Sequence, residues 1–255
     1  MILLFLLSVV NISVSIAPLA GIMEEIGGNY FKYEVIYPVS ANPHMYEPRP
    51  RDILKVKKSE LFVYSGRAEP GAEKLCRIAK RCISIEKRLN IKRDVNPHIW
   101  LSPKLVKVMA DSLSLELSRL VPDKKDMFMK KASMMKFKID SILKKLKDSK
   151  KGTILLMHGA FVPLFKELGF NVLVVAKEPG MEPGARRIKE LSEMLNRQRV
   201  LFGVCESNRP CTPVKMLSKR YGFKVITLDP LYTESFTDFL RKTVLTVKNA
   251  ANSGN

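Results

Sequence analysis

Short apolar runs alternate with amphipathic stretches along most of the chain. The runs are rich in β-branched side chains, as is typical of buried parallel strands, and the stretches between them have apolar residues at helical spacing. Glycine or proline marks most of the transitions. The pattern predicts strands at residues 12–17, 33–37, 61–64, 82–85, 153–157, 171–176, 200–204 and 224–228.

Helices are predicted in most of the intervals between these strands. Two long ones, at residues 103–120 and 123–150, follow each other in the middle of the chain and are separated by Pro122. The β-α alternation then starts again. We therefore predict an α/β fold with two parallel-sheet lobes, at 12–122 and 152–255, joined by a linking helix at 123–151 that is about 40 Å long.

Residues 1–10 are apolar apart from Ser8. They are too few to span a bilayer, which takes about 20 residues. The stretch resembles the hydrophobic region of a signal peptide but lacks a basic start and a clear cleavage site. Residues 1–11 are therefore interpreted either as a truncated signal segment or as an apolar lead into the first strand.

The net charge of +19 is high for a chain with 46% hydrophobic residues. Its densest basic excess lies at residues 123–151, which have 11 basic and 4 acidic side chains. No aromatic ladder, zinc-finger spacing or RNA-binding motif accompanies it, so we interpret it as the solvated face of a helix and expect no nucleic-acid partner. The same excess can hold the protein at an anionic membrane surface.

The four cysteines form two close pairs, Cys76 with Cys82 and Cys205 with Cys211. Neither pair has the C-x-x-C spacing of zinc or redox motifs. Each pair can form a disulfide if its Cα atoms lie within about 7 Å, as would suit an oxidising compartment. The other interpretation, that they are small buried side chains, stays open.

All three histidines of the chain, and one aspartate, come after predicted strands. His44 and His98 lie in two Asn-Pro-His motifs, while His158 and Asp229 directly follow strands of the second lobe. Ligands of open parallel sheets bind beyond the carboxyl ends of the strands. We therefore predict one metal site between the lobes with two ligands from each, because three imidazoles and a carboxylate suit tetrahedral Zn²⁺.

Residues near these ligands have alternative interpretations. Glu47 is either a fourth ligand, a group that orients His44, or a surface carboxylate. Tyr46 and Trp100 are predicted to be walls that keep the cleft dry. Glu206 is interpreted as a structural or gating carboxylate and not as a ligand.

Four sequence blocks resemble the metal-binding blocks of the zinc/manganese solute-binding proteins of ABC transporters (cluster A-I), and most closely their ZnuA-like zinc-uptake branch. The resemblance extends from Ile12 to the last helix and includes Ser65-Gly66 with Glu69, and Glu182-Pro183. The four blocks are Asn42-Pro43-His44-Met45-Tyr46-Glu47-Pro48, Asn96-Pro97-His98-Ile99-Trp100, His158-Gly159-Ala160-Phe161 and Leu228-Asp229-Pro230-Leu231.

The resemblance implies two Rossmann-like lobes joined by one backbone helix. It further implies an extracytoplasmic, monomeric receptor that captures Zn(II) and delivers it to a membrane permease, without enzyme activity. His158 stands where the manganese branch has a carboxylate, which favours zinc over Mn²⁺. Asn96, Gly159 and Gly184 depart from the family pattern, and the His- and Asp-rich loop of many zinc-specific members is missing.

Three other functions are compatible with these residues. The scaffold can serve as a manganese-type carrier or as a surface adhesin. A zinc hydrolase would hold the ion with the three histidines alone, and Glu47 or Asp229 would then activate a water in the fourth position.

Overall fold

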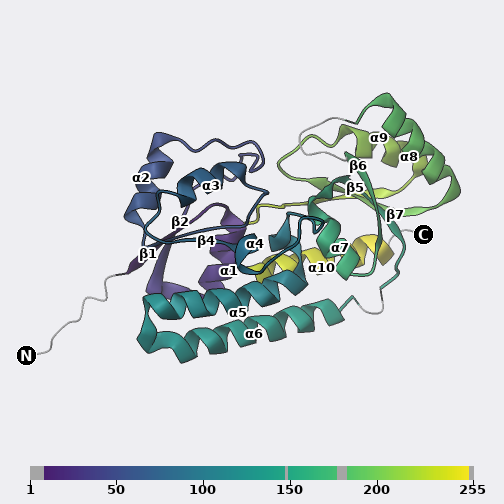
Figure 1. Ribbon diagram of the computed structural model, residues 1–255. Coiled ribbons are helices and arrows are strands. Elements are labelled where there is room, and N and C mark those ends of the chain that lie inside the picture. The colour runs from purple at the N-terminus through teal and green to yellow at the C-terminus, as the bar shows by residue number, and fades with distance from the viewer. Residues whose placement is uncertain (1–8, 147–148, 177–182, 253–255) are drawn as a thin grey trace, which may run out of the picture. The chain divides into compact units, whose positions relative to one another are not determined.

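The computed structural model describes residues 9–146, 149–176 and 183–252, and its elements are labelled in Figure 1. The chain divides into two compact units. The first contains the described residues up to Ile91 together with Val108–Met135, and the second contains Lys92–Lys107 together with the described residues from Lys136 onward. Residues 1–8 of the expected signal segment at 1–11 lie outside the described residues, and so does Glu182.

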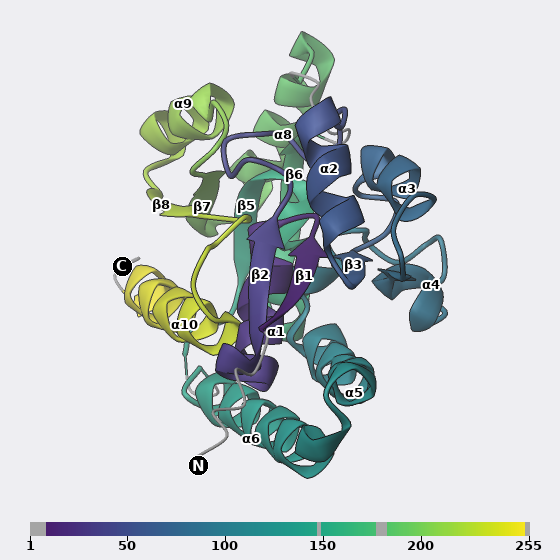
Figure 2. The same ribbon diagram turned by 90° about the vertical axis from the view of Figure 1, so that its left-hand side faces the viewer.

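The first unit is built on a parallel sheet of four strands in the order β2-β1-β3-β4. Figure 2 shows β1 and β2 side by side and pointing in the same direction. Its strands are β1 (Val10–Val14), β2 (Phe31–Val35), β3 (Leu61–Tyr64) and β4 (Cys82–Ser84). The accompanying helices are α1 (Ala17–Gly27), α2 (Pro50–Lys58), α3 (Pro70–Cys76) and α4 (Ile85–Arg88). All of β3 is buried, as its uninterrupted apolar sequence predicts.

The second unit repeats this arrangement with strand order β6-β5-β7-β8, again entirely parallel. Its strands are β5 (Thr153–His158), β6 (Asn171–Ala176), β7 (Val200–Glu206) and β8 (Lys224–Leu228). Its helices are α7 (Val162–Glu167), α8 (Ala185–Arg197), α9 (Thr212–Tyr221) and α10 (Phe236–Asn252). β5 and β7 are buried along their whole length, so they form the centre of this core. The two parallel sheets confirm the predicted α/β fold class.

Two long helices occupy the middle of the chain. Helix α5 (Pro103–Leu120) has the predicted bounds, and a short 3₁₀ turn at Pro122–Lys124 separates it from α6 (Lys125–Lys144). Helix α6 is about 30 Å long at 1.5 Å per residue, shorter than predicted, because after Lys144 the backbone changes to tighter turns with i to i−3 hydrogen bonds. The division between the units falls within both helices.

Residues 92–107 group with the second unit, although chain order assigned them to the first lobe. The reason is a set of long-range hydrogen bonds. The Asn96 amide donates to the carbonyl of Gly159 at 2.9 Å, and the Trp100 indole donates to the carbonyl of Pro230 at 2.8 Å. The segment that carries His98 is therefore fixed by contacts with the same unit that contains His158.

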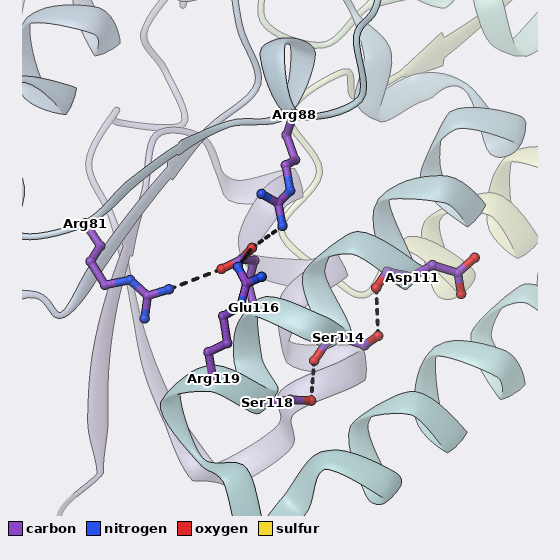
Figure 3. Close-up of polar contacts among 7 residues, drawn as sticks. All are labelled: Arg81, Arg88, Asp111, Ser114, Glu116, Ser118 and Arg119. Carbon is purple, nitrogen blue, oxygen red and sulfur yellow. Dashed lines mark hydrogen bonds and ion pairs between the residues drawn. The ribbon is translucent and has the colours of Figure 1, made fainter.

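A buried carboxylate fastens α5 to the β4 edge of the first unit (Figure 3). The Glu116 side chain is only 3% exposed, and its Oε2 lies 3.2 Å from Arg81, which immediately precedes β4. Its Oε1 pairs with Arg88, the last residue of α4, and with Arg119 of its own helix. Three guanidinium groups thus compensate one buried charge, which would otherwise be costly to desolvate.

Both cysteine pairs form disulfides in the structure. Cys76 at the end of α3 is bonded to Cys82 at the start of β4, with Cα atoms 5.4 Å apart. Cys205 in β7 is bonded to Cys211, just before α9, with Cα atoms 5.7 Å apart. Among the described helices, none combines the length and apolar character that crossing a membrane requires.

Candidate metal centre

Both Asn-Pro-His motifs form the same local turn. The backbone N–H of His44 donates to Oδ1 of Asn42 at 3.1 Å, and the backbone N–H of His98 donates to Oδ1 of Asn96 at 2.9 Å. A side-chain oxygen that accepts from the backbone two residues later is an Asx turn, which only Asn or Asp can supply. The asparagines therefore set the backbone that presents each histidine.

The His44 loop follows β2 in the first unit and is anchored by Tyr46. The Tyr46 side chain is buried, its hydroxyl donates to Oδ2 of Asp52 at 2.7 Å, and its ring centroid lies 4.4 Å from that of Tyr37. Burial, together with the hydrogen bond to Asp52, raises the pKa of Tyr46. A side chain at Gly71 would clash with the Tyr46 carbonyl oxygen, 2.4 Å from an added Cβ, so α3 packs tightly against this loop. The half-buried His44 is thus held on a well-supported loop.

The second unit brings His98 and His158 together. Candidate ligand nitrogens of the two rings lie within 4.8 Å of each other, and the ring centroids are 5.2 Å apart with planes 82° to each other. Both residues are buried, at 5% and 4% exposure. His158 is the last residue of β5, and His98 is in the segment that the Asn96 and Trp100 contacts attach to this unit.

Oxygen acceptors hold the Nδ1 atoms of both rings. His98 Nδ1 lies 2.9 Å from Oδ1 of Asn96, and His158 Nδ1 lies 3.1 Å from Oε1 of Glu206. The Asn96 amide orientation is fixed because its nitrogen donates to the Gly159 carbonyl. An oxygen acceptor at Nδ1 favours the tautomer with the proton there, which puts the lone pair on Nε2. Both rings can therefore offer Nε2 to a metal ion.

Glu206, which the sequence predicted to be a structural or gating carboxylate, lies next to His158. It ends β7, its side chain is 3% exposed, and besides His158 it contacts Arg209, whose Nε lies 3.3 Å from its Oε2. The Cys205–Cys211 disulfide closes the loop that contains Glu206 and Arg209. A carboxylate ending an otherwise apolar run was the available sequence signal, but its partner is 48 residues away in the chain.

Asp229 follows β8 in the same unit and is half-buried. Its Oδ1 accepts the backbone N–H of Leu231 at 2.8 Å, which is another Asx turn. Within the described residues, no carboxylate belongs to the cluster of candidate metal ligands that contains His98 and His158, whose ligand atoms all lie within 4.8 Å of one another. The structure thus brings the two imidazoles together and leaves Asp229 outside that spacing.

Glu47 and Trp100 differ in burial and in the residues that they contact. The Glu47 side chain is 71% exposed, and its Oε2 lies 2.6 Å from Nζ of Lys74. This geometry favours the interpretation of Glu47 as a surface carboxylate. Trp100 is 1% exposed, and its hydrogen bond to Pro230 links the segment of His98 to the loop of Asp229. Its ring is part of the core of the second unit.

A second buried glutamate, Glu69, lies in the loop after β3 of the first unit. It is fully buried, and the hydroxyl of Ser65 donates to its Oε1 at 2.6 Å. Burial raises the pKa of Glu69 to about 7, and hydrogen bonds from neighbouring serines lower it less. The sequence interpretation included Glu69 only as part of the family resemblance, because no local pattern distinguishes a buried loop carboxylate from an exposed one.

Comparison with known proteins identifies the family. Residues 12–250 match the model of the family described as ZnuA, zinc-uptake complex component A, periplasmic. A zinc-binding lipoprotein AdcA of Streptococcus pneumoniae is 27% identical over 260 residues, which cover 89% of this chain and 51% of AdcA. This chain therefore spans about half the length of the AdcA lipoproteins that it matches.

Two further relatives match over most of their own length. The manganese ABC transporter substrate-binding lipoprotein PsaA of Streptococcus mitis is 28% identical over 246 residues, covering 86% of this chain and 77% of PsaA. The structure of the laminin binding protein Lmb of Streptococcus agalactiae, described as bifunctional with adhesin and metal transporting activity, superposes with a TM-score of 0.86 at 25% identity, covering 95% of this chain and 99% of Lmb. With the match of the family model over nearly the whole chain, these likenesses show that the chain belongs to the ZnuA family of periplasmic zinc-uptake components.

Proposed function

We propose that this protein is an extracytoplasmic receptor that captures a metal ion, with Zn²⁺ as its cargo, and delivers it to the permease of an ABC transporter. The observation that carries the proposal is the pair formed by His98 and His158. Their ligand nitrogens lie within 4.8 Å, and each Nδ1 is held by an oxygen acceptor. Family membership supports the transport role.

We propose His44 as the third ligand and Asp229 as the fourth. The Asx turn that presents His44 is the same as that of His98, and Asp229 follows a strand of the sheet that ends in His158. Three imidazoles and one carboxylate would fill the tetrahedral coordination of zinc and leave no position for a reactive water. This closed ligand set, together with relatives described as binding lipoproteins, favours a carrier over the hydrolase alternative.

The choice of zinc over manganese rests on the donor atoms. Imidazole nitrogen suits zinc, whereas manganese prefers sites rich in oxygen. His158 supplies nitrogen, and its supporting carboxylate, Glu206, is bonded to Nδ1 of the ring. The relatives include both a zinc-binding and a manganese-transporting lipoprotein, so the cargo needs a direct measurement.

A competition experiment tests the cargo. The protein is purified without chelators, its metal content is measured by mass spectrometry, and Zn²⁺ and Mn²⁺ then compete for the apoprotein. We expect bound zinc as purified, and displacement of manganese by equimolar zinc. Retention of manganese against equimolar zinc would reverse the choice of cargo, and failure to bind either ion would refute the metal-receptor proposal.

Metal release should follow protonation of the imidazoles. Only neutral imidazole binds a metal ion, so acid competes with zinc for the same lone pairs. We expect zinc affinity, measured by calorimetry, to be at least tenfold weaker at pH 5 than at pH 7.5. An affinity that is equal at the two pH values would contradict ligation by histidine.

The likeness to Lmb supports a second candidate, adhesion to an extracellular polypeptide. Such a partner would bind outer faces and would not need the imidazoles. Binding of laminin by the His98→Ala variant at wild-type strength would support adhesion as a separate activity. The absence of laminin binding by the wild-type protein would exclude laminin as the partner.

A further inference from the structure

The second unit contains a cavity at the end of its sheet opposite to His158 and Asp229. Its volume is about 600 Å³, within the usual range of small-molecule sites. It lies where the connections from α8 to β7 and from α9 to β8 run next to each other. The first residues paired between these strands are Phe202 and Lys224, so Val200 and Leu201 extend beyond the start of β8 and line the cavity.

Every charged side chain that lines this cavity is basic, namely Arg197, Arg199 and Lys224. In the described part of the chain, neither Arg197 nor Lys224 has an ion-pair or hydrogen-bond partner for its side chain. Arg187 of α8, by contrast, forms an ion pair with Glu190. Two uncompensated cations and a third arginine thus surround one concave surface.

The helix dipole explains the position of only one of the three basic residues. Arg197 is the last residue of α8, where a cation interacts favourably with the helix dipole. Arg199 and Lys224 are outside any helix, immediately before β7 and at the start of β8, so no dipole explains them. The walls are also fixed, because Gly222 ends α9 with a φ of 73° and the Tyr221 hydroxyl donates to the carbonyl of Ser192 at 3.0 Å.

We propose that this cavity binds a phosphate-bearing ligand. Guanidinium groups match the oxygens of phosphate in paired hydrogen bonds, and a nearby ammonium adds a point charge. The exposed side-chain amides of Asn196 and Gln198 also line the cavity and can donate to further oxygens. The partly buried ring of Tyr221 provides an apolar wall for the organic part of a phosphate ester.

The phosphate can belong to a soluble ester or to a lipid headgroup. His158 and Asp229 are at the carboxyl ends of the strands, and the cavity is at their amino ends. A lipid in the cavity would turn the proposed metal ligands of this unit away from the membrane. A soluble ester would impose no orientation, so this geometry favours the soluble source.

Calorimetry at fixed ionic strength tests the site with two probes, glycerol 3-phosphate and vesicles of phosphatidylglycerol. The test variant combines Arg197→Gln with Lys224→Gln. The control variant combines Arg186→Gln with Lys248→Gln, which removes the same charge from exposed positions of α8 and α10. We expect the wild type and the control to bind glycerol 3-phosphate, and the test variant to bind it at least tenfold more weakly.

Two other results also decide the question. Vesicle binding that is lost only in the test variant, without binding of glycerol 3-phosphate, would support the site with a lipid as the source. Equal binding by both variants, or no binding of either probe by the wild type, would overturn the proposal. Zinc affinity is measured in parallel: it should be unchanged in both variants, which shows that they are folded and keeps this test independent of the transport proposal.

Discussion

Two buried glutamates lie near the carboxyl ends of corresponding strands in the two units. Strand β3 has the same position in the order of the first sheet as β7 has in the second. Glu69 lies in the loop after β3, and Glu206 ends β7. Neither is exposed to solvent by more than 5%. The two residues nevertheless have different electrostatic environments.

The partners explain the difference. Glu206 is within ion-pair distance of Arg209 and contacts the imidazole of His158, so groups that can bear positive charge compensate its burial. Glu69 has serine partners, which donate hydrogen bonds but bear no charge, and its pKa therefore rises to about 7. Near the ends of corresponding strands, one unit thus has a carboxylate that can orient a metal ligand and the other has a titrating acid.

Replacing the ligand that Glu206 supports should have the largest effect. His158→Ala removes a proposed metal ligand and leaves the buried Glu206 without its imidazole partner. We expect zinc affinity to fall more than 100-fold in competition with a fluorescent chelator. Glu69→Gln is the matched control from the other sheet and should bind zinc like the wild type. A loss below tenfold in His158→Ala would remove His158 from the ligand set.

Glu69 should make folding stability depend on pH. The folded state keeps the Glu69 proton up to about pH 7, whereas the unfolded chain loses it near the ordinary value of 4.5. The folded state binds more protons between these values, so its stability falls as the pH rises through this window. The 2.5-unit difference corresponds to about 3 kcal/mol.

Urea unfolding at pH 5 and pH 8 measures this effect. Between these pH values, we expect the free energy of unfolding of the wild type to fall by about 2 kcal/mol more than that of Glu69→Gln, which has no proton to lose. A parallel pH dependence in the two proteins would mean that Glu69 does not titrate in the folded state.

Glu206→Gln should weaken zinc binding without abolishing it. The amide oxygen can still accept from Nδ1 of His158, but the negative charge of the carboxylate that holds the ring is lost. Changes at positions of this kind cost about 10–100-fold in metal affinity. Glu190→Gln, which disrupts a partly buried pair with Arg187, is the matched control. Equal affinities of the two variants would assign Glu206 a structural role only.

Glu47→Ala should have the smallest effect. The Glu47 side chain is largely exposed and pairs with Lys74, and exposed pairs contribute about 0–1 kcal/mol. We expect zinc affinity within a factor of about two of the wild type, whereas Asp229→Ala should lose far more. Comparable losses in the two variants would mean that the fourth ligand has been misassigned.

Sequence patterns predicted the strands and most helices, although β1 and β2 begin two residues earlier than predicted. The strands at Leu61–Tyr64, Asn171–Ala176 and Lys224–Leu228 have the predicted bounds, as does α5. These segments are defined locally, by apolar runs that must be buried and by glycine or proline at their ends. The end of α6 and the short helix α4 were less predictable, because the signals at helix ends are weak.

The sequence by itself determined which segments are strands, the Asx turns of the two Asn-Pro-His motifs and the positions of the histidines after strands, because each depends on neighbouring residues. Tertiary structure decided that residues 92–107 join the second unit and that Glu206 supports His158. The contacts responsible join residues 48 to 132 positions apart. No local pattern specifies such pairs, since they form only when packing brings distant segments together.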